Sequence, residues 1–295
     1  MPDPVGISLV DKPGGMTSHD VVSRARRALD TRRIGHAGTL DPMATGLLIL
    51  GVGAATRLLT FLVGLDKTYT ATIRLGVATD SDDADGALTA TTDASSVTGD
   101  DVAHAMAALT GEISQVPSTV SAVKVGGRRA YDLARAGEEV ELRARDVVVS
   151  RFDLLATRRD GAAVDLDVVV DCSSGTYVRA LARDLGTALG VGGHLTALRR
   201  TRIGPFEVDR APGLDDLSEA RLVPAAEVAS RVLGGLDVTA QEARDLRHGK
   251  RIPGAARLVG ARVAAIDPDG RLVGIVERRG AELKSVMNMP EEASA

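Results

Sequence analysis

Polar and apolar residues alternate along residues 67–76, which predicts a strand with one buried face. Tyr69 begins the apolar side of this strand, and threonines occupy most of the other side. The stretches 147–155 and 163–172 also favour paired strands, and the second alternates valine or leucine with aspartate. An unbroken apolar run at residues 47–50 predicts a strand that inserts into a sheet.

Three segments have apolar residues at helical spacing and a suitable residue at the helix start. Ser18 is expected to cap a helix with a strongly basic polar face, and Thr98 to cap a helix over residues 98–109. Residues 173–176 are expected to cap a third helix. Arg179 lies in the first turn of that helix but off its apolar stripe. Because a helix N-terminus favours anions, Arg179 could hold a carboxylate or a phosphate.

A second unit is predicted near the C-terminus, where residues 239–242 form a capping-box sequence. Two strands are expected at residues 257–266 and 271–278, joined by a turn at 267–270. From Glu282 onward we expect a tail without regular structure.

The length of 295 residues allows one large domain, or one with a small appendage, and an ample core. Hydrophobic content of 44% and charged content of 26% are ordinary for a soluble globular protein. The single cysteine, Cys172, excludes an internal disulfide and a multi-cysteine metal site. Because it lies in an apolar strand, it is interpreted as a small buried thiol rather than a nucleophile.

The net charge of −4 argues against binding of nucleic acid over the whole surface, so an RNA-binding protein of this composition must concentrate its positive charge. Arginine and lysine gather in three clusters, at residues 24–33, 124–135 and 199–202. Such runs more often form solvated faces. Residues 115–146 mix glycine and arginine with a weak helix near 131–135, and predict a mobile basic excursion from the sheet that suits the clamping of RNA.

The sequence disfavours secretion, a membrane location, and a site for a nucleotide cofactor or a metal. The N-terminus lacks the basic and apolar parts of a signal peptide, and no apolar run approaches about 18 residues, so we expect a cytoplasmic protein that does not enter a membrane. No GxxxxGK[ST] loop is present, and residues 51–53 lack the spacing of a dinucleotide fingerprint. Neither a nucleotide cofactor nor a metal is implied. The acidic, turn-rich stretch at 79–86 predicts a solvated loop.

Residues 35–46 contain the main candidate for chemistry. Three glycines punctuate this stretch, and Asp41 precedes a proline, which restricts Asp41 to extended or turn conformations. The apolar run 47–50 follows and is expected to anchor the bend. A catalytic carboxylate needs such a fixed position. For an arbitrary Asp-Pro pair, however, a simple turn is the commoner explanation.

The stretch 35–46, continued by residues 47–53, resembles the catalytic motif of the TruB family of tRNA pseudouridine synthases, in which the aspartate of a Gly-x-Leu-Asp-Pro core is essential. Five further motifs recur in the family's order, namely Lys12-Pro13 with Gly15 to Ser18, Asp66 to Tyr69, Thr79 to Gly86, Gln115 to Pro117 with Ser121 to Lys124, and Ser174 to Arg179. Chance is a poor explanation for so many ordered matches.

The resemblance implies an α+β fold, with a mixed, largely antiparallel central sheet flanked by helices. It implies a catalytic domain at residues 1–222, within which residues 117–146 form an insertion that clamps RNA, and a linker at 223–236. The elements expected at 237–290 resemble a small β-rich PUA domain, an RNA-binding module that accompanies this family. Residues 291–295 are expected to form a disordered tail.

The resemblance also assigns catalytic roles. Asp41 is expected to be the catalytic carboxylate and to pair with Arg179. Whether Asp41 adds to C1′ of the ribose or removes the C2′ proton stays open. Tyr69 is expected to stack on the target base and is the candidate for taking the C5 proton. Since the ordinary pKa of tyrosine is about 10, burial or a nearby charge must assist that step.

Further residues are expected to bind the substrate. Leu198 matches an apolar residue that lines the uracil pocket, and Tyr177 is expected to contact the flipped nucleotide or its phosphate. His36 resembles a residue that fills the space vacated in the T-loop, although a lone histidine is more often structural. Plausible phosphate contacts are Lys12, Lys67, Lys124 and Arg129.

The function implied by the resemblance is that of a stand-alone tRNA pseudouridine synthase acting on U55 of the T-loop, as a monomer and without guide RNA. The alternative is a non-catalytic tRNA-binding or RNA-folding protein on the same scaffold. The intact set of Asp41, Tyr69 and Arg179 favours the enzyme, because a protein that only binds has no need of a buried aspartate next to RNA. A third hypothesis, a glycosidase of free nucleosides, leaves the C-terminal module unexplained.

Overall fold

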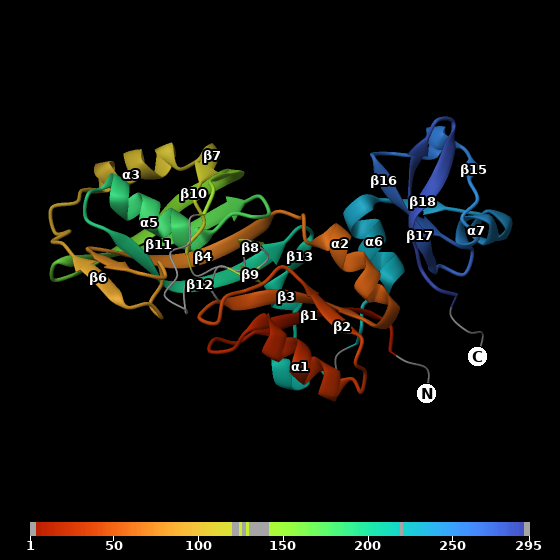
Figure 1. Ribbon diagram of the computed structural model, residues 1–295, viewed down its shortest axis with the longest axis horizontal. Helices are drawn as coiled ribbons and strands as arrows, with labels where there is room; N and C mark the ends of the chain where they lie inside the picture. Colours follow the sequence, from red (N-terminus) through yellow and green to blue (C-terminus); the bar gives the residue numbers. More distant parts are fainter. Residues whose placement is uncertain (1–3, 120–123, 126–127, 130–141, 219–220, 292–295) are drawn as a thin grey trace. The chain divides into compact units, whose positions relative to one another are not determined.

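The computed structural model describes residues 4–119, 124–125, 128–129, 142–218 and 221–291. The chain folds as two compact units. The first consists of Met1–Asp41, Gly46–Val63 and Gly204–Ala295, and the second of Pro42–Thr45 and Gly64–Ile203. Figure 1 shows the elements in chain order. No helix within the described residues is long and apolar enough to cross a membrane.

The N-terminal part of the first unit is an antiparallel arrangement of β1 (Gly6–Lys12), β3 (Thr45–Val52) and β2 (Ile34–Ala37), with β3 paired to both of the others. Residues 47–52 of β3 are all buried, which confirms the strand expected from the apolar run. The helix α1 (Ser18–Ala28) packs its apolar side on Leu48 and Leu50. The 3₁₀ helix η1 (Gly53–Leu58) and the short α2 (Leu59–Leu62) follow β3.

The same unit continues after residue 203. Its smaller elements are β13 (Phe206–Glu207), the 3₁₀ helices η2 (Val208–Arg210), η3 (Leu214–Asp216) and η4 (Ala255–Arg257), and the helix α6 (Ala225–Leu233). The helix α7 (Ala240–Arg247) begins with the expected capping box of Thr239 and Glu242. Five strands then form one sheet in the order β14 (Gly235–Asp237), β16 (Arg262–Ile266), β17 (Leu272–Arg279), β18 (Glu282–Asn288) and β15 (Ile252–Pro253).

The prediction of an unstructured tail from Glu282 is wrong, because Glu282 begins strand β18. This strand pairs with β17 on one side and β15 on the other, so its backbone groups bond to both neighbours. Its side chains are exposed or half-buried apart from the fully buried Leu283, and such a strand gives a weak hydrophobic pattern. Of the tail expected at 291–295, residues 292–295 lie outside the described residues.

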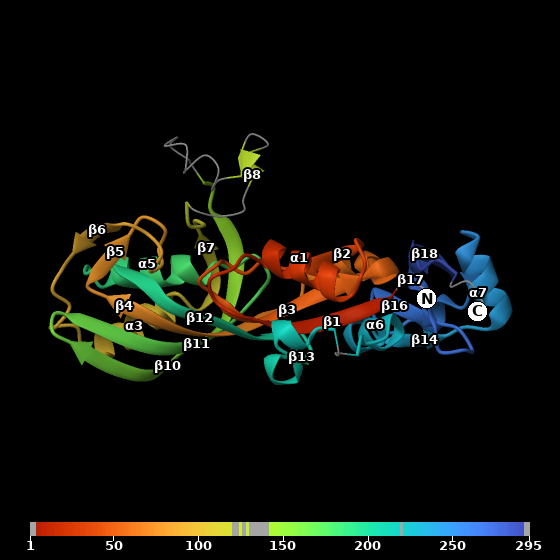
Figure 2. The same ribbon diagram turned by 90° about the horizontal axis from the view of Figure 1, so that it is seen from below.

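The second unit is built on five antiparallel strands. Their order is β12 (Gly193–Ile203), β4 (Lys67–Leu75), β11 (Ala163–Cys172), β10 (Arg145–Asp160) and β7 (Gly111–Gln115). Figure 2 shows β10 and β11 as long strands side by side. Alternate residues of β4 are buried from Lys67 to Leu75, as the alternating pattern predicts.

Helices and short strands complete this unit. The helix α5 (Val178–Ala188) packs on β12 and β4, and α3 (Gly99–Ala108) contacts both α5 and β10. The strands β5 (Val77–Thr79) and β6 (Leu88–Thr91) form one pair, and β8 (Lys124–Val125) and β9 (Arg128–Arg129) form another. The helix expected near residues 131–135 lies outside the described residues. Antiparallel strands flanked by helices confirm the expected α+β class.

Two of the three expected helix caps differ in detail. Thr98 caps α3 as predicted, and the structure adds a capping box with Asp101. Thr17 rather than Ser18 caps α1, in a capping box with Asp20. The cap residue of α5 is Tyr177, which makes no side-chain cap bond, so residues 173–176 do not supply the cap.

Candidate active site

The loop that contains Asp41 joins β2 to β3, and its backbone is hydrogen-bonded to the side chain of Ser18. The Leu40 amide donates to Ser18 Oγ over 2.8 Å, and Ser18 Oγ donates to the Leu40 carbonyl over 3.1 Å. Ser18 and Leu40 are 1% and 3% exposed. Gly38, with φ of +83°, supplies a left-handed turn on the approach. The backbone next to the half-buried Asp41 is therefore held by a buried hydroxyl of α1.

Two other predicted residues lie in the first unit. His36 is half-buried on β2, opposite Leu50 of β3. Lys12 ends β1 and is completely buried, with its ammonium donating to the carbonyls of Pro13 and Met16 over 2.9 and 2.8 Å. Lys12, which was expected to contact phosphate, is therefore not presented to solvent. Lys12 instead ties together the turn that leads into α1.

Tyr69 and Leu198 lie on neighbouring strands of the second unit. Tyr69, on β4, is 8% exposed and stands opposite Arg200 of β12 and Val170 of β11. Leu198, on β12, is 7% exposed and stands opposite Ala71, which shares the buried side of β4 with Tyr69. The two predicted base-binding side chains thus come from the same buried face.

Lys67 is at the start of the same side of β4 and is 6% exposed. Its ammonium donates to the Leu65 carbonyl. Burial, assisted by the charge of Arg200, lowers the pKa of Lys67 to about 8. The neighbouring Cys172, opposite Lys67 on β11, is a buried thiol as predicted, and burial raises its pKa to about 11.

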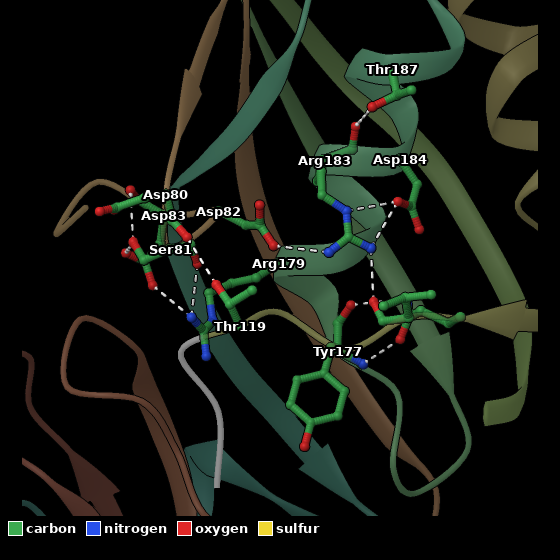
Figure 3. A network of polar contacts seen from close by, with 12 residues as sticks. Asp80, Ser81, Asp82, Asp83, Thr119, Tyr177, Arg179, Arg183, Asp184 and Thr187 are labelled. Carbon is green, nitrogen blue, oxygen red and sulfur yellow. Dashed lines mark hydrogen bonds and ion pairs between the residues drawn. The ribbon is translucent and has the colours of Figure 1, made fainter. Parts of the chain in front are cut away.

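Arg179 is held by the acidic turn at residues 79–86, as Figure 3 shows. Its Nη1 donates to the Ser81 carbonyl over 2.8 Å and lies 3.2 Å from Asp83 Oδ2. Arg179 is 3% exposed and Asp83 is 4% exposed. Asp83 is oriented in turn by the Ser81 hydroxyl and the Asp85 amide, at 2.5 and 3.1 Å. An arginine off the apolar stripe of α5 is thus buried against carboxylate and carbonyl oxygens.

The prediction that residues 79–86 form a solvated loop is wrong at its centre. Ser81, Asp82 and Asp83 are only 6%, 7% and 4% exposed. The reason is the pair of arginines four residues apart on α5, Arg179 and Arg183, which both face this loop. Those two arginines on one side of a packed helix are the signal that could have indicated nearby buried carboxylates.

Tyr177 is the residue before α5, and the side chain of Gln115 binds the backbone of Tyr177. The Tyr177 amide donates to Gln115 Oε1 over 2.9 Å, and Gln115 Nε2 donates to the Tyr177 carbonyl over 3.1 Å. Gln115 is 2% exposed, so a buried side-chain amide fixes the residue that precedes α5. The Tyr177 ring itself points away from the polar network and is half-buried.

The remaining predicted residues lie in the β8–β9 pair, where Lys124 stands opposite Arg129. Tyr69, Tyr177, Arg179 and Leu198 therefore belong to the second unit, on β4, on β12 and at the start of α5, whereas Asp41, His36 and Lys12 belong to the first unit. The pairing of Asp41 with Arg179 stays a prediction.

Three family models match the chain. Residues 26–178 match the N-terminal domain of the TruB family pseudouridylate synthases. Residues 179–237 match a tRNA pseudouridylate synthase B C-terminal domain, and residues 234–290 match the C-terminal region of tRNA pseudouridine synthase II.

Individual proteins of the same kind are also similar to the chain. The chain is 56% identical to tRNA pseudouridine synthase B of Leifsonia xyli subsp. xyli, over 98% of both chains. It is 54% identical to the protein of that name from Mycolicibacterium paratuberculosis, over 96% of this chain and 97% of the other. A chain in the crystal structure of a Cbf5-Nop10-Gar1 complex superposes with a TM-score of 0.71 at 27% identity, covering 98% of this chain and 84% of that chain.

Proposed function

Because the chain belongs to the TruB family of pseudouridylate synthases, we propose that it converts U55 in the T-loop of tRNA to pseudouridine. The observation that carries the proposal is the placement of Asp41 in a Gly-Thr-Leu-Asp-Pro segment whose backbone is bound by Ser18. The identity of 54% and 56% to proteins named tRNA pseudouridine synthase B, over nearly the whole chain, supports tRNA as the substrate.

The reaction breaks the bond between C1′ of ribose and N1 of uracil, turns the base, and joins C5 to C1′. The uracil that leaves is a delocalised anion, so this cleavage depends less on a general acid than ordinary glycoside hydrolysis, which uses two carboxyl groups. One carboxylate, Asp41, is sufficient for the proposed chemistry. We propose that Arg179 stabilises its charge, since an opposite charge nearby favours the ionised form of a carboxyl group.

The proposed base pocket uses residues of the sheet. Tyr69 stacks on the target uracil and takes the C5 proton, Leu198 lines the pocket, and Tyr177 contacts the extruded nucleotide. Extrusion of a base costs a few kcal/mol, and stacking on an aromatic ring contributes about 1–3 kcal/mol in return. His36 fills the space that the base leaves in the T-loop.

Phosphate contacts supply further affinity. We assign them first to Lys124 and Arg129, which stand opposite each other in the β8–β9 pair. Lys12 and Lys67 are weaker candidates, because both are buried and both ammonium groups already donate to backbone carbonyls.

The test uses the purified full chain and an unmodified tRNA transcript without added cofactor, followed by mapping of pseudouridine by position. We expect product at U55 only. Product elsewhere, or none, would overturn the assignment of the substrate position. Free uridine in a parallel reaction is expected to remain unchanged, which separates the enzyme from a nucleosidase.

The variant Asp41→Asn tests the catalytic role. It should bind tRNA with unchanged affinity and form no pseudouridine, whereas the matched control Asp100→Asn, on the exposed start of α3, should retain full activity. Unchanged product with Asp41→Asn would refute the mechanism.

The two possible roles of Asp41 can be separated with a tRNA substrate whose target uridine is deuterated at C2′. Removal of the C2′ proton predicts a primary isotope effect on the single-turnover rate. Attack of the carboxylate on C1′ breaks no C2′–H bond and predicts none.

A further inference from the structure

One arginine of α5 ties together three segments of the second unit. Arg183 Nη1 lies 3.1 Å from Asp82 Oδ2, and its Nη2 donates to the Val116 carbonyl over 2.7 Å. Its Nε donates to Asp184 Oδ1 over 2.9 Å. The guanidinium therefore joins α5, the acidic turn, and the segment that leads out of β7. These contacts are drawn in Figure 3.

That segment, residues 115–119, is called here the root, since the stretch expected to clamp RNA, residues 117–146, begins within it. Besides the contact of Val116 with Arg183, Thr119 Oγ1 donates to the Asp80 carbonyl over 3.1 Å. Gln115 holds both backbone groups of Tyr177 at the start of α5. Ser118 is completely buried. The root is thus fixed to the acidic turn and to α5 at several points.

The acidic turn contacts the root and Arg179 through neighbouring residues. Asp80 and Asp82 face the root and Arg183, whereas Ser81 and Asp83 hold Arg179. The Asp82 carbonyl accepts from the Leu195 amide of β12 over 3.0 Å, which fixes the centre of the turn to the sheet.

The backbone of Asp82 has an unfavourable conformation, and the contacts of this residue with its neighbours maintain it. Its φ is +61°, a left-handed value that is uncommon outside glycine and costs of order 1–3 kcal/mol at a constrained site. Burial raises the pKa of its carboxyl, and the Ser118 hydroxyl and the Arg183 guanidinium oppose that rise. Loss of Arg183 would leave a buried carboxyl without its cation on a strained backbone.

We propose that Arg183 and Asp82 are positioning residues, which lock the root to the acidic turn and so keep the Arg179 guanidinium in its working position. The inference rests on the proposed function, in which Arg179 assists Asp41. Neither Arg183 nor Asp82 is required to touch the RNA. Their loss should therefore slow the chemical step more than it weakens tRNA binding.

The first test is the single-turnover rate and tRNA affinity of Arg183→Met. A misplacement of a catalytic group by about 1 Å can cost about 100-fold, so we expect a rate 10 to 100 times lower, with the dissociation constant changed less than about threefold. The matched control Arg151→Met removes an exposed arginine that pairs with Asp153 on β10, and should have the wild-type rate. An unchanged rate in Arg183→Met, or a loss confined to affinity, would overturn the proposal.

The second test asks whether Arg183 acts through Arg179. In an Arg179→Lys background, the further change Arg183→Met should reduce the residual rate by less than threefold, because the position of the Arg179 guanidinium no longer matters. Independent effects would multiply, and that outcome would refute the coupling. If Arg183→Met does not fold, the double variant Asp82→Asn/Arg183→Met takes its place in this test. The double variant removes both charges of the buried pair, and asparagine tolerates the positive φ of residue 82.

Amide hydrogen exchange gives a readout that needs no activity. Arg183→Met should raise exchange both in residues 115–119 and in the first turn of α5. Faster exchange in the root alone would overturn the coupling. A wild-type chain inactive on tRNA would refute the proposed function instead, and the exchange result would still decide whether the root and Arg179 are coupled.

Discussion

Arg179 and Asp83 form a buried ion pair, with Nη1 3.2 Å from Oδ2 and side chains that are 3% and 6% exposed. Two charges removed from water contribute little to net stability, because desolvation offsets most of their attraction. Such a pair does fix the position of the guanidinium, which also donates to the Ser81 carbonyl. An arginine proposed to assist a catalytic carboxylate needs this constraint.

Asp83→Asn is predicted to weaken both the fold and the reaction. Removal of one member of a buried ion pair typically costs about 3–5 kcal/mol, and the freed guanidinium can shift. We expect the free energy of unfolding in urea to fall by up to that amount, and the single-turnover rate on tRNA to fall about tenfold or more. The control is Asp153→Asn, which breaks an exposed pair with Arg151 and should change stability by less than about 1 kcal/mol. Equal effects of the two variants would show that burial of Asp83 has no consequence.

Ser18→Ala is predicted to impair catalysis from outside the site. The Ser18 hydroxyl binds both backbone groups of Leu40, the residue before Asp41. Each buried group left without a partner costs about 1–3 kcal/mol, and the loop is free to move. We expect a lower single-turnover rate with unchanged tRNA affinity. Ser23→Ala, half-buried on the same helix, is the control for a general effect on α1. A Ser18→Ala enzyme with the full rate would refute the role of this hydroxyl.

Gln115→Ala is predicted to destabilise the start of α5. The change removes the acceptor that the Gln115 side chain offers to the Tyr177 amide, at a cost of about 1–3 kcal/mol, whereas the Tyr177 carbonyl keeps the Leu181 amide as a donor. Urea unfolding should report this loss. Gln115→Glu keeps an acceptor for the Tyr177 amide but buries a carboxyl group next to the Tyr177 carbonyl, so it should also be less stable than the wild type. Gln241→Ala, exposed on α7, should change stability by less than about 0.5 kcal/mol.

The buried ammonium of Lys67 predicts that stability rises with pH just above neutrality. Burial lowers its pKa from 10.5 to about 8. Above pH 8 the folded protein has released this proton and the unfolded chain keeps it, so unfolding takes up a proton and becomes less favourable as pH rises. The expected increase in the free energy of unfolding between pH 8 and pH 9 is at most about 1.4 kcal/mol.

Cys172 has the opposite effect at higher pH. Burial raises the pKa of its thiol from 9.0 to about 11, so above pH 9 the unfolded chain loses a proton that the folded protein keeps, and stability falls. Urea unfolding at pH 8 and pH 9 checks the first sign. Lys67→Met should abolish the rise, and Cys172→Ala should preserve it. A wild-type stability that falls over this interval would contradict the buried position of Lys67.

Several features were predictable because their causes lie within a few residues. The capping boxes of α3 and α7 each join residues three positions apart, and the buried side of β4 follows from simple alternation. The placement of Asp41 in a bend followed by a buried strand was likewise readable from a glycine-rich, Asp-Pro segment and the apolar run behind it.

Other features were misjudged because distant partners decide them. Thr17 and Ser18 are both suitable caps for α1. Thr17 is the cap in the structure, and Ser18 instead forms hydrogen bonds with Leu40, 22 residues away. Lys12 looks like a surface lysine in a turn, yet local carbonyls and the packed fold bury it completely.

The sequence by itself determined the local elements, the family, and the identity of the candidate catalytic residues. Only the tertiary structure decided that the centre of the acidic turn is buried and that Gln115 binds the residue before α5. The bonds concerned join residues 98 positions apart for Ser81 and Arg179, and 62 apart for Gln115 and Tyr177. Whether a carboxylate is solvated or buried depends on whether it pairs with a cation in the folded chain. The spacing of residues along the sequence does not predict that pairing.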